Sequence, residues 1–296
     1  AYIDTVIQEV IDETGLDPAT TPMKIYTNMD PDVQTLIDDI QRGDVDGAFS
    51  FYDDLEEIGS VVLNNHTGEV VGVLGGRNYA KGGALMLNHA TQQWKQPGSS
   101  IKPLLDYTLA FENLGWSTSQ TVLDGPIVID GSVSVVNSEG IGVYNGEVSV
   151  EWAVNHSKNA PAARTLQYVV NKMSSAYVVE YLNNLGFDVS QDQFSMQYAF
   201  GGASFTVTCM ELASAQSMLF NGGVRVEPHT VKRIEFLDGR DPIEIQSDET
   251  SCVSAEAAFL TTELLKSNVN GGYLGLWRFN GNYQVYAKTG TTDWGT

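Results

Sequence analysis

Three short motifs supply residue types that can carry out acyl transfer. They are Ser-x-x-Lys (Ser99 to Lys102), Ser-x-Asn (Ser157 to Asn159) and Lys-Thr-Gly (Lys288 to Gly290), and each occurs once. A serine hydroxyl is a weak nucleophile until a neighbouring base takes its proton. Residues three apart share one face of a helix, so Lys102 can reach the Ser99 hydroxyl. The spacing indicates a nucleophile and its base, whereas Ser99 considered alone is equally typical of a helix N-cap.

Local sequence around each motif indicates the element that must position it. A Pro-Gly pair stands directly before Ser99, and the apolar segment after it predicts a helix. The sequence Asn-Ala-Pro can start a second helix, which leaves Ser157 and Asn159 in the loop just before it. The segment YQVYA predicts a strand that Lys288 closes, and Gly290 lets a ligand approach the backbone. A helix start, a loop and a strand end can together enclose one cleft.

The rest of the chain predicts an α+β fold. Apolar residues recur at helical spacing in the stretch that ends at Gly15, in the stretch that Asp30 can cap, and in the segments SSAYVVEYLNNLGF, TCMELASAQSMLFNGG and SAEAAFLTTELLK. Strand patterns occur in MKIYTNM, in a hairpin of residues 58–65 and 69–74, and late in VRVEPHTVKRIEFLDG and YQVYAKTGTT. Strands at both ends of a helical middle region predict a mostly antiparallel sheet flanked by helices.

Composition excludes several classes of partner. The 296 residues carry 37 acidic and 16 basic side chains, a formal net charge of −21, so nucleic acid and anionic lipid would repel the chain. No apolar run is long enough to span a bilayer, and no signal segment opens the chain. Two cysteines, Cys209 and Cys252, lack metal-ligand spacing, and the sequence does not determine whether they pair.

Other patterns of chemical residues are weaker. The four histidines are scattered and form no ligand motif, so no metal site is predicted. No Gly-x-Ser-x-Gly elbow occurs, which argues against an α/β-hydrolase triad. The glycines of GIGVYNG have the wrong spacing for a phosphate loop and indicate a turn. The three motifs therefore remain the strongest candidates for a site.

The order of the motifs along the chain is the one found in penicillin-binding proteins and class A β-lactamases. Longer blocks extend the similarity: KIYTNMDPDVQ, TGEVVGVLGGRNY, NHATQQWKQPGSSIKP, HSKNAPAARTL, MLFNGGVRVEP and YAKTGTT. Across nearly all of its length, the chain resembles the transpeptidase region of a bifunctional, class A penicillin-binding protein.

The resemblance implies acyl transfer from a peptidoglycan stem peptide that ends in D-alanyl-D-alanine, with β-lactams as inhibitors. Ser99 would attack the penultimate carbonyl, Lys102 would act as base, and Ser157 would relay a proton to the leaving amine. Asn159 would bind the substrate or orient Lys102. Lys288, Thr289 and Thr291 would receive the terminal carboxylate, with Gly290 beside them. The backbone N–H groups of Ser99 and Thr291 would hold the oxyanion. The reaction requires no cofactor.

Two alternatives belong to other functional classes. A β-lactamase must hydrolyse its acyl-enzyme quickly, and class A members use a Glu-x-x-Leu-Asn motif for this step. The nearest match, Glu180 to Asn183, is one residue too short. A β-lactam sensor would be acylated without turnover. A lead-in segment resembling a connector favours the bifunctional enzyme.

The resemblance also implies the organisation of a longer protein. Residues 1–55 are expected to form a connector after a glycosyltransferase domain, and residues 56–296 a transpeptidase domain that lacks a final strand and helix at its C-terminus. The full protein is expected at the outer face of the bacterial cell membrane, anchored by a segment absent from this sequence. Expected partners are stem peptides, β-lactams and other proteins of cell-wall assembly.

Overall fold

The chain folds into two compact units. The structure, a computed structural model, describes residues 1–45, 51, 53, 56–77, 79, 86–272 and 283–292. Unit 1 comprises Ala1–Trp94, Thr208–Ser217 and Val226–Glu249, and unit 2 comprises Lys95–Val207, Met218–Arg225 and Thr250–Thr296. All eight predicted site residues belong to unit 2, so the site can be described within that unit alone.

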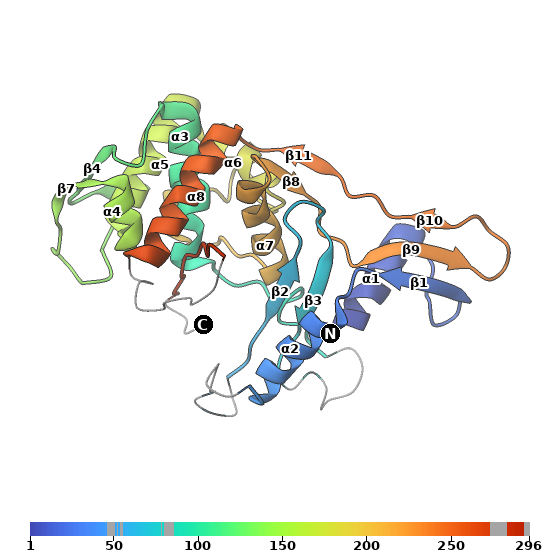
Figure 1. Cartoon of the computed structure of the whole chain (residues 1–296). Helices are drawn as coiled ribbons and strands as arrows, with labels where there is room; N and C mark the ends of the chain where they lie inside the picture. The colour runs from blue at the N-terminus through green and yellow to red at the C-terminus, as the bar shows by residue number, and fades with distance from the viewer. Residues whose placement is uncertain are drawn as a thin grey trace. The chain divides into compact units, whose positions relative to one another are not determined.

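Unit 1 packs helices against small antiparallel sheets. Its elements are α1 (Tyr2–Thr14), β1 (Met23–Thr27), α2 (Pro31–Arg42), β2 (Ser60–Leu63), β3 (Val70–Leu74), α7 (Cys209–Ser217), β9 (Val231–Phe236) and β10 (Ile243–Glu244). Strand β9 lies between β1 and β10, and β2 pairs with β3 (Figure 1). The Asp30 side chain accepts the N–H groups of Asp32 and Val33, which confirms the predicted cap of α2.

A small core joins these elements of unit 1. It contains Tyr2, Val6 and Val10 of α1 together with valines of β3 and buried residues of β9. The Tyr2 hydroxyl donates to the Val70 carbonyl oxygen at 2.6 Å, so the one polar atom of this ring is satisfied inside the core. Ile3, which shares the helical apolar pattern, is 67% exposed, and the buried face is therefore narrower than the sequence predicts.

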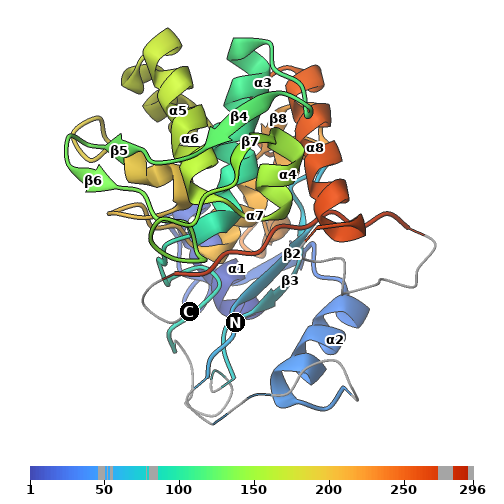
Figure 2. The same cartoon turned by 90° about the vertical axis from the view of Figure 1, so that its left-hand side faces the viewer.

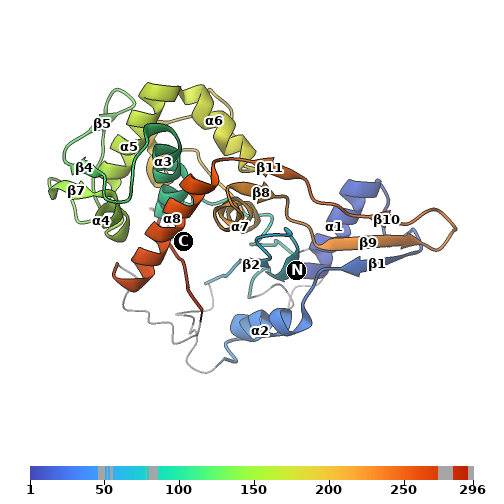
Figure 3. The ribbon, with the colours of Figure 1, turned by 45° about the horizontal axis from the view of Figure 1, so that its top comes forward.

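Three of the helices of unit 2 pack together at its centre. Its helical elements are η1 (Gly98–Ile101), η2 (Pro103–Tyr107), α3 (Thr108–Leu114), α4 (Val150–Asn155), α5 (Asn159–Met173), α6 (Ser175–Asn184), η3 (Met196–Phe200), η4 (Met218–Phe220) and α8 (Ala255–Asn270). Helix α3 lies between α5 and α8 (Figures 1 and 3). The run from η1 through η2 to α3 is continuous, and its side chains from Ile101 to Phe111 are all buried. Ser99 therefore stands at the start of a segment fixed by the core.

The strands of unit 2 are short and antiparallel where their register is defined. Strand β4 (Thr121–Asp124) pairs with β7 (Gly146–Ser149), and β5 (Val128–Ile129) pairs with β6 (Val133–Ser134). Strands β8 (Val224–Val226) and β11 (Glu249–Ser251) form a further pair. Together with the helices these sheets confirm the predicted α+β class with antiparallel pairing, although the described residues divide the sheet into several small ones.

The predicted strand before Lys288 is wrong for the described residues. Residues 284–292 form no strand, and Figure 2 shows them as a red trace without an arrow. An alternating segment becomes a strand only when a neighbour completes its hydrogen-bond ladder, and no described strand pairs with it. Cys209 and Cys252 are free thiols. None of the described helices combines the length and hydropathy needed to cross a bilayer. The connector at residues 1–55 stays a prediction.

Candidate active site

The two adjacent serines of the first motif have different surroundings. The Ser100 hydroxyl donates to the Pro97 carbonyl oxygen at 2.7 Å and is thereby committed to the helix start. Among the described residues, the Ser99 hydroxyl has no hydrogen-bond partner, and it caps no helix because it lies inside η1. Ser99 is partly exposed. Its oxygen is therefore available for chemistry, and the N-cap alternative does not apply.

Lys102 is fully buried, and its amine contacts the second motif. Its Nζ donates to the backbone oxygen of Ser157 and to Oδ1 of Asn159, both at 2.6 Å. Burial lowers the pKa of Lys102 well below its usual range, and the positive charge of Lys288 lowers this pKa further. A neutral amine has two N–H groups and one lone pair. With both N–H groups engaged, the lone pair of Lys102 remains free to accept a proton.

Ser157 connects the second motif to the third. Its Oγ accepts a hydrogen bond from Nζ of Lys288 at 2.9 Å, while its carbonyl oxygen accepts the one from Lys102. Its φ of 52° is uncommon for a residue other than glycine, and such backbone strain is concentrated at functional sites. This turn directs the hydroxyl and the carbonyl of one residue to two different lysines. Burial lowers the pKa of Lys288 to about 8.

The Lys-Thr-Gly segment runs against the turn that carries Ser99. A Cβ on Gly290 would lie 2.3 Å from the Pro97 carbonyl oxygen, and one on Gly98 would lie 2.4 Å from the Thr291 carbonyl oxygen. Both distances are far below van der Waals contact, so only glycine allows the two backbones to approach this closely. Thr289 directly precedes Gly290, and its carbonyl oxygen accepts a hydrogen bond from Lys288 Nζ at 2.9 Å. The approach places the third motif beside the first.

The structure thus brings the three motifs together despite their separation in sequence. Lys102 touches Ser157 and Asn159, Lys288 touches Ser157, and the backbone around Gly290 touches the turn of Ser99. Asn159 is the first residue of α5 and not part of the preceding loop, a shift of one position from the sequence prediction. The arrangement joins an uncommitted hydroxyl, a buried amine and a second, partly buried lysine, which are the groups needed for acyl transfer.

A buried carboxyl beside the site has no sequence motif. Asp106 lies one helical turn after Lys102, in the π-helical turn η2, and its side chain is completely buried. Neither carboxyl oxygen has a hydrogen-bond partner, and burial raises the pKa of Asp106 well above its usual range. A π-helical turn is rare and frequently marks a functional site. The sequence offers no pattern that separates this aspartate from a solvated one.

A network behind Asn159 was also missed by sequence analysis. Asn137 accepts the backbone N–H groups of Asn159 and Ala160 at 2.9 and 3.1 Å, and donates to Asp124 at 2.7 Å. Lys158, the middle residue of the second motif, is buried and pairs with Glu139 and with Asp124. Asn137 lies in a turn-rich stretch, where asparagine is common for reasons of backbone geometry.

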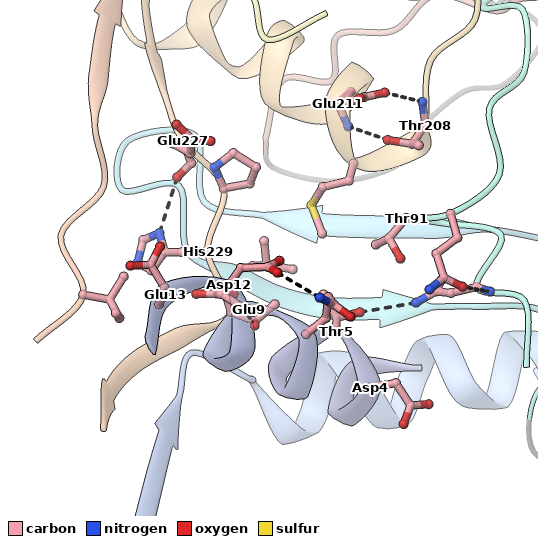
Figure 4. Close-up of a pocket in the computed structure, with 18 of the residues that line it drawn as sticks. Asp4, Thr5, Glu9, Asp12, Glu13, Thr91, Thr208, Glu211, Glu227 and His229 are labelled. Carbon is pink, nitrogen blue, oxygen red and sulfur yellow. Dashed lines mark hydrogen bonds between the residues drawn. The ribbon is translucent and has the colours of Figure 1, made fainter. Parts of the chain in front are cut away.

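Unit 1 contains a separate hollow of about 620 Å³ with many carboxylates (Figure 4). The Glu9 carboxylate accepts backbone N–H groups of Thr230 and Val231 at 2.6 and 3.0 Å, and Glu211 accepts that of Thr208 at 2.7 Å. These two carboxylates stabilise the chain around them. Among the described residues, no group of His, Cys, Asp and Glu could hold a metal ion. The hollow contains none of the predicted site residues.

Comparison with known proteins gives consistent results. Residues 58–296 match the family model described as "Penicillin binding protein transpeptidase domain". The chain is 33% identical over 295 residues to penicillin-binding protein 1A/1B of Bacillus subtilis (strain 168), covering 99% of this chain and 31% of that protein. It is 28% identical over 281 residues to penicillin-binding protein 1A of Streptococcus pneumoniae (strain ATCC BAA-255 / R6), covering 92% and 38%. The chain thus spans about a third of the length of these curated relatives.

Solved structures show the same fold. The penicillin-binding protein PonA1 from Mycobacterium tuberculosis superposes with a TM-score of 0.80 at 21% identity, over 99% of this chain and 75% of that one. PonA1 in complex with penicillin V gives a TM-score of 0.77 at 20% identity, over 99% and 77%. These similarities extend through both compact units.

Proposed function

Because the chain belongs to the penicillin-binding protein transpeptidase family, we propose that it is a serine D,D-transpeptidase that cross-links peptidoglycan stem peptides. The observation that carries this proposal is the burial and hydrogen bonding of the Lys102 amine. Its buried amine uses both N–H groups on Ser157 and Asn159, three residues from an uncommitted serine hydroxyl. A neutral lysine in this setting is a base for Ser99.

In the proposed acylation step, the Ser99 hydroxyl gives its proton to Lys102 Nζ as its oxygen attacks the carbonyl carbon of the penultimate D-alanine. A C–O bond forms and a tetrahedral oxyanion results, which we place against the backbone N–H groups of Ser99 and Thr291. The C–N bond then breaks. The proton held by Lys102 passes, with Ser157 as relay, to the nitrogen of the departing D-alanine, and the acyl group stays on Ser99.

In the second step, the amine of a neighbouring stem peptide attacks the acyl-enzyme. Lys102 accepts a proton from this amine and returns one to the Ser99 oxygen as the ester bond breaks, so the enzyme is restored. A new amide bond now joins the two stems. The same groups therefore act once in each direction, as microscopic reversibility requires.

Lys288 supplies charge for recognition in this proposal. Its Nζ donates to Ser157 Oγ, which leaves the Ser157 hydroxyl hydrogen free to donate elsewhere. The terminal carboxylate of a stem peptide, or that of a β-lactam, would bind Lys288 with the hydroxyl groups of Thr289 and Thr291. The peptidoglycan substrate lies outside the cell membrane, and we place the site of action there.

The β-lactamase alternative finds little support in the structure. Glu180 is exposed on α6, so its carboxylate lacks the desolvated surroundings of a catalytic base. A β-lactam sensor would share the acylation step with a transpeptidase and differ only in turnover. The two are distinguished by experiment.

Mass spectrometry of the intact protein during incubation with benzylpenicillin tests the proposal. We expect one adduct per chain, stable for hours, on Ser99. Ser100→Ala is the matched control and should keep the adduct, while Ser99→Ala and Lys102→Ala should lose it. An adduct that persists in Ser99→Ala overturns the assignment, and rapid loss of the parent's adduct identifies a β-lactamase. Turnover of a thioester analogue of the stem peptide distinguishes the transpeptidase from a sensor.

A further inference from the structure

The N-terminus of α5 is capped by a residue far away in sequence. Lys158 occupies the N-cap position and its side chain makes no capping hydrogen bond. Instead, Oδ1 of Asn137 accepts the N–H groups of Asn159 and Ala160 at 2.9 and 3.1 Å. Asn137 is only 2% exposed. It therefore performs the role of an N-cap from a different segment of unit 2, at the residue that contacts Lys102.

The amide of Asn137 is held in one orientation. Its Nδ2 donates to Oδ1 of Asp124 at 2.7 Å and to the Val143 carbonyl oxygen at 3.1 Å. Asp124 is completely buried, and its other carboxylate oxygen accepts the Asn145 N–H at 3.0 Å. Rotating the Asn137 amide by half a turn would place its oxygen against the oxygens of Asp124 and Val143. Its NH2 group would then face the backbone N–H groups of α5. The carboxylate of Asp124 thus fixes which end of Asn137 faces α5.

The segment of Asn137 also fixes the side chain of Asn159. The carbonyl oxygen of Val136 accepts Nδ2 of Asn159 at 2.8 Å. Because the amide nitrogen is used there, Oδ1 must point to the other side, where it accepts from Lys102 Nζ at 2.6 Å. The backbone and the amide of Asn159 are therefore both set by two consecutive residues, 136 and 137.

We propose that Asn137, held by Asp124, is a positioning residue for acylation: it fixes Asn159, and through Asn159 it directs the lone pair of Lys102 at the Ser99 hydroxyl. This inference rests on the proposed function of Ser99 and Lys102. The ion pair of Lys158 with Glu139 also joins the second motif to the segment that carries Asn137. A small displacement at Asn159 would turn the Lys102 amine, and a misplacement of about 1 Å can cost about 100-fold in rate.

A positioning role and a purely structural role predict different results. If Asn137 only stabilised the fold, its loss would lower the melting temperature and the fraction of chains that react, but the chains that stay folded would react at the parent rate. If it positions Lys102, every folded chain should still react, but slowly. The rate constant for acylation should fall while the non-covalent dissociation constant for benzylpenicillin stays near that of the parent.

The test measures benzylpenicillin acylation in the full chain for the parent, Asn137→Ala and a matched control. Asn183→Ala serves as control because the Asn183 side chain makes three hydrogen bonds in unit 2, one fewer than that of Asn137, to Val179 and Val189 and away from the motifs. We expect complete labelling of Asn137→Ala at a rate about 10- to 100-fold below the parent, and labelling of Asn183→Ala within about twofold of it. Asn137→Ala reacting as fast as the control overturns the inference.

A charge-conserving exchange tests the pair directly. Asn137→Asp alone places two buried carboxylates together, and Asp124→Asn alone removes the fixed acceptor, so both should be slow. In the double variant Asp124→Asn with Asn137→Asp, the amide at position 124 can donate to the carboxylate at position 137, which can still accept the N–H groups of Asn159 and Ala160, whereas the Val143 carbonyl oxygen loses its donor.

The double variant should react faster than either single variant, because it restores the pair and the cap of α5, and its rate tests the inference if Asn137→Ala does not fold. A double variant that fails to fold, or that is as slow as Asn137→Asp, refutes the inference. A parent chain that is not labelled at Ser99 refutes the proposed function instead, so the two failures are distinguishable.

Discussion

Replacing Lys288 with arginine should remove the fall in acylation rate at alkaline pH, which is the alkaline limb of the pH profile. Burial lowers the pKa of Lys288 to about 8. If its positive charge receives the carboxylate of the ligand, half of the chains lose this charge at about pH 8, and about one in ten retains it at pH 9. The acylation rate of the parent should therefore halve near pH 8 and fall about tenfold per unit above it. An arginine stays charged throughout this range.

The variant Lys288→Gln separates the effect of charge from that of shape. Losing one charge-assisted hydrogen bond costs about 1.5 to 3 kcal/mol, or about 10- to 150-fold in rate. The positive charge of Lys288 also helps to lower the pKa of Lys102. Its removal should raise the pKa of Lys102 and move the acid limb to higher pH, whereas Lys288→Arg should leave the acid limb where it is.

Stopped-flow measurement of acylation by a chromogenic cephalosporin between pH 5 and 10 provides the assay, with circular dichroism at each pH as the control for folding. We expect a bell-shaped pH profile for the parent, a profile without the alkaline limb for Lys288→Arg, and a slower profile with a displaced acid limb for Lys288→Gln. An alkaline limb near pH 8 that persists in Lys288→Arg would show that another group titrates there and would refute the argument.

Two further substitutions test the close approach of the two backbones and the buried carboxyl. Gly290→Ala should abolish rapid acylation and lower stability by about 1 to 3 kcal/mol, because its Cβ would lie 2.3 Å from the Pro97 carbonyl oxygen. Gly271→Ala is the control: its Cβ meets no atom closer than 4.0 Å, so it should react at the parent rate. Equal rates for the two would contradict the close approach. For Asp106 the raised pKa means that the folded chain binds more protons than the unfolded chain, so its stability contribution falls as pH rises above about 4. Urea unfolding should therefore show Asp106→Asn gaining stability over the parent from pH 4 to pH 7, and a gain that does not grow with pH would show that Asp106 is ionised in the folded chain.

Elements with a complete local signal could be predicted from the sequence. Helix α2 begins where Asp30 caps it, and α1 ends at Gly15, whose φ of 69° favours a residue without a side chain. The hairpin of β2 and β3 follows from two apolar stretches around a turn. The strand predicted before Lys288 does not form in the part of the chain that the structure describes. A strand depends on its neighbour, and alternation alone contains no information about that neighbour.

The candidate site divides in the same way between local and non-local information. Spacing alone predicted that Lys102 can reach Ser99, and the resemblance predicted Ser157, Asn159 and Lys288 as members of the same site. The supports of these residues carry no such signal. Asn137 is 22 residues from Asn159 and accepts its N–H only because the loop folds back onto α5. Whether such a residue matters depends on the path of the backbone.

The burial that would activate Lys102 is accompanied by two nearby features that lower the stability of the fold. Exclusion of water lowers the pKa of the Lys102 amine, and the same exclusion leaves both oxygens of Asp106 without a partner. Ser157 adopts a strained φ of 52° so that its hydroxyl and carbonyl serve two lysines. Each feature lowers stability, and each lies within one or two contacts of Lys102. The buried amine, the unpaired carboxyl and the positive φ all lie where acid–base chemistry would need them. The well-packed helices α3, α5 and α8 supply the stability that offsets their cost.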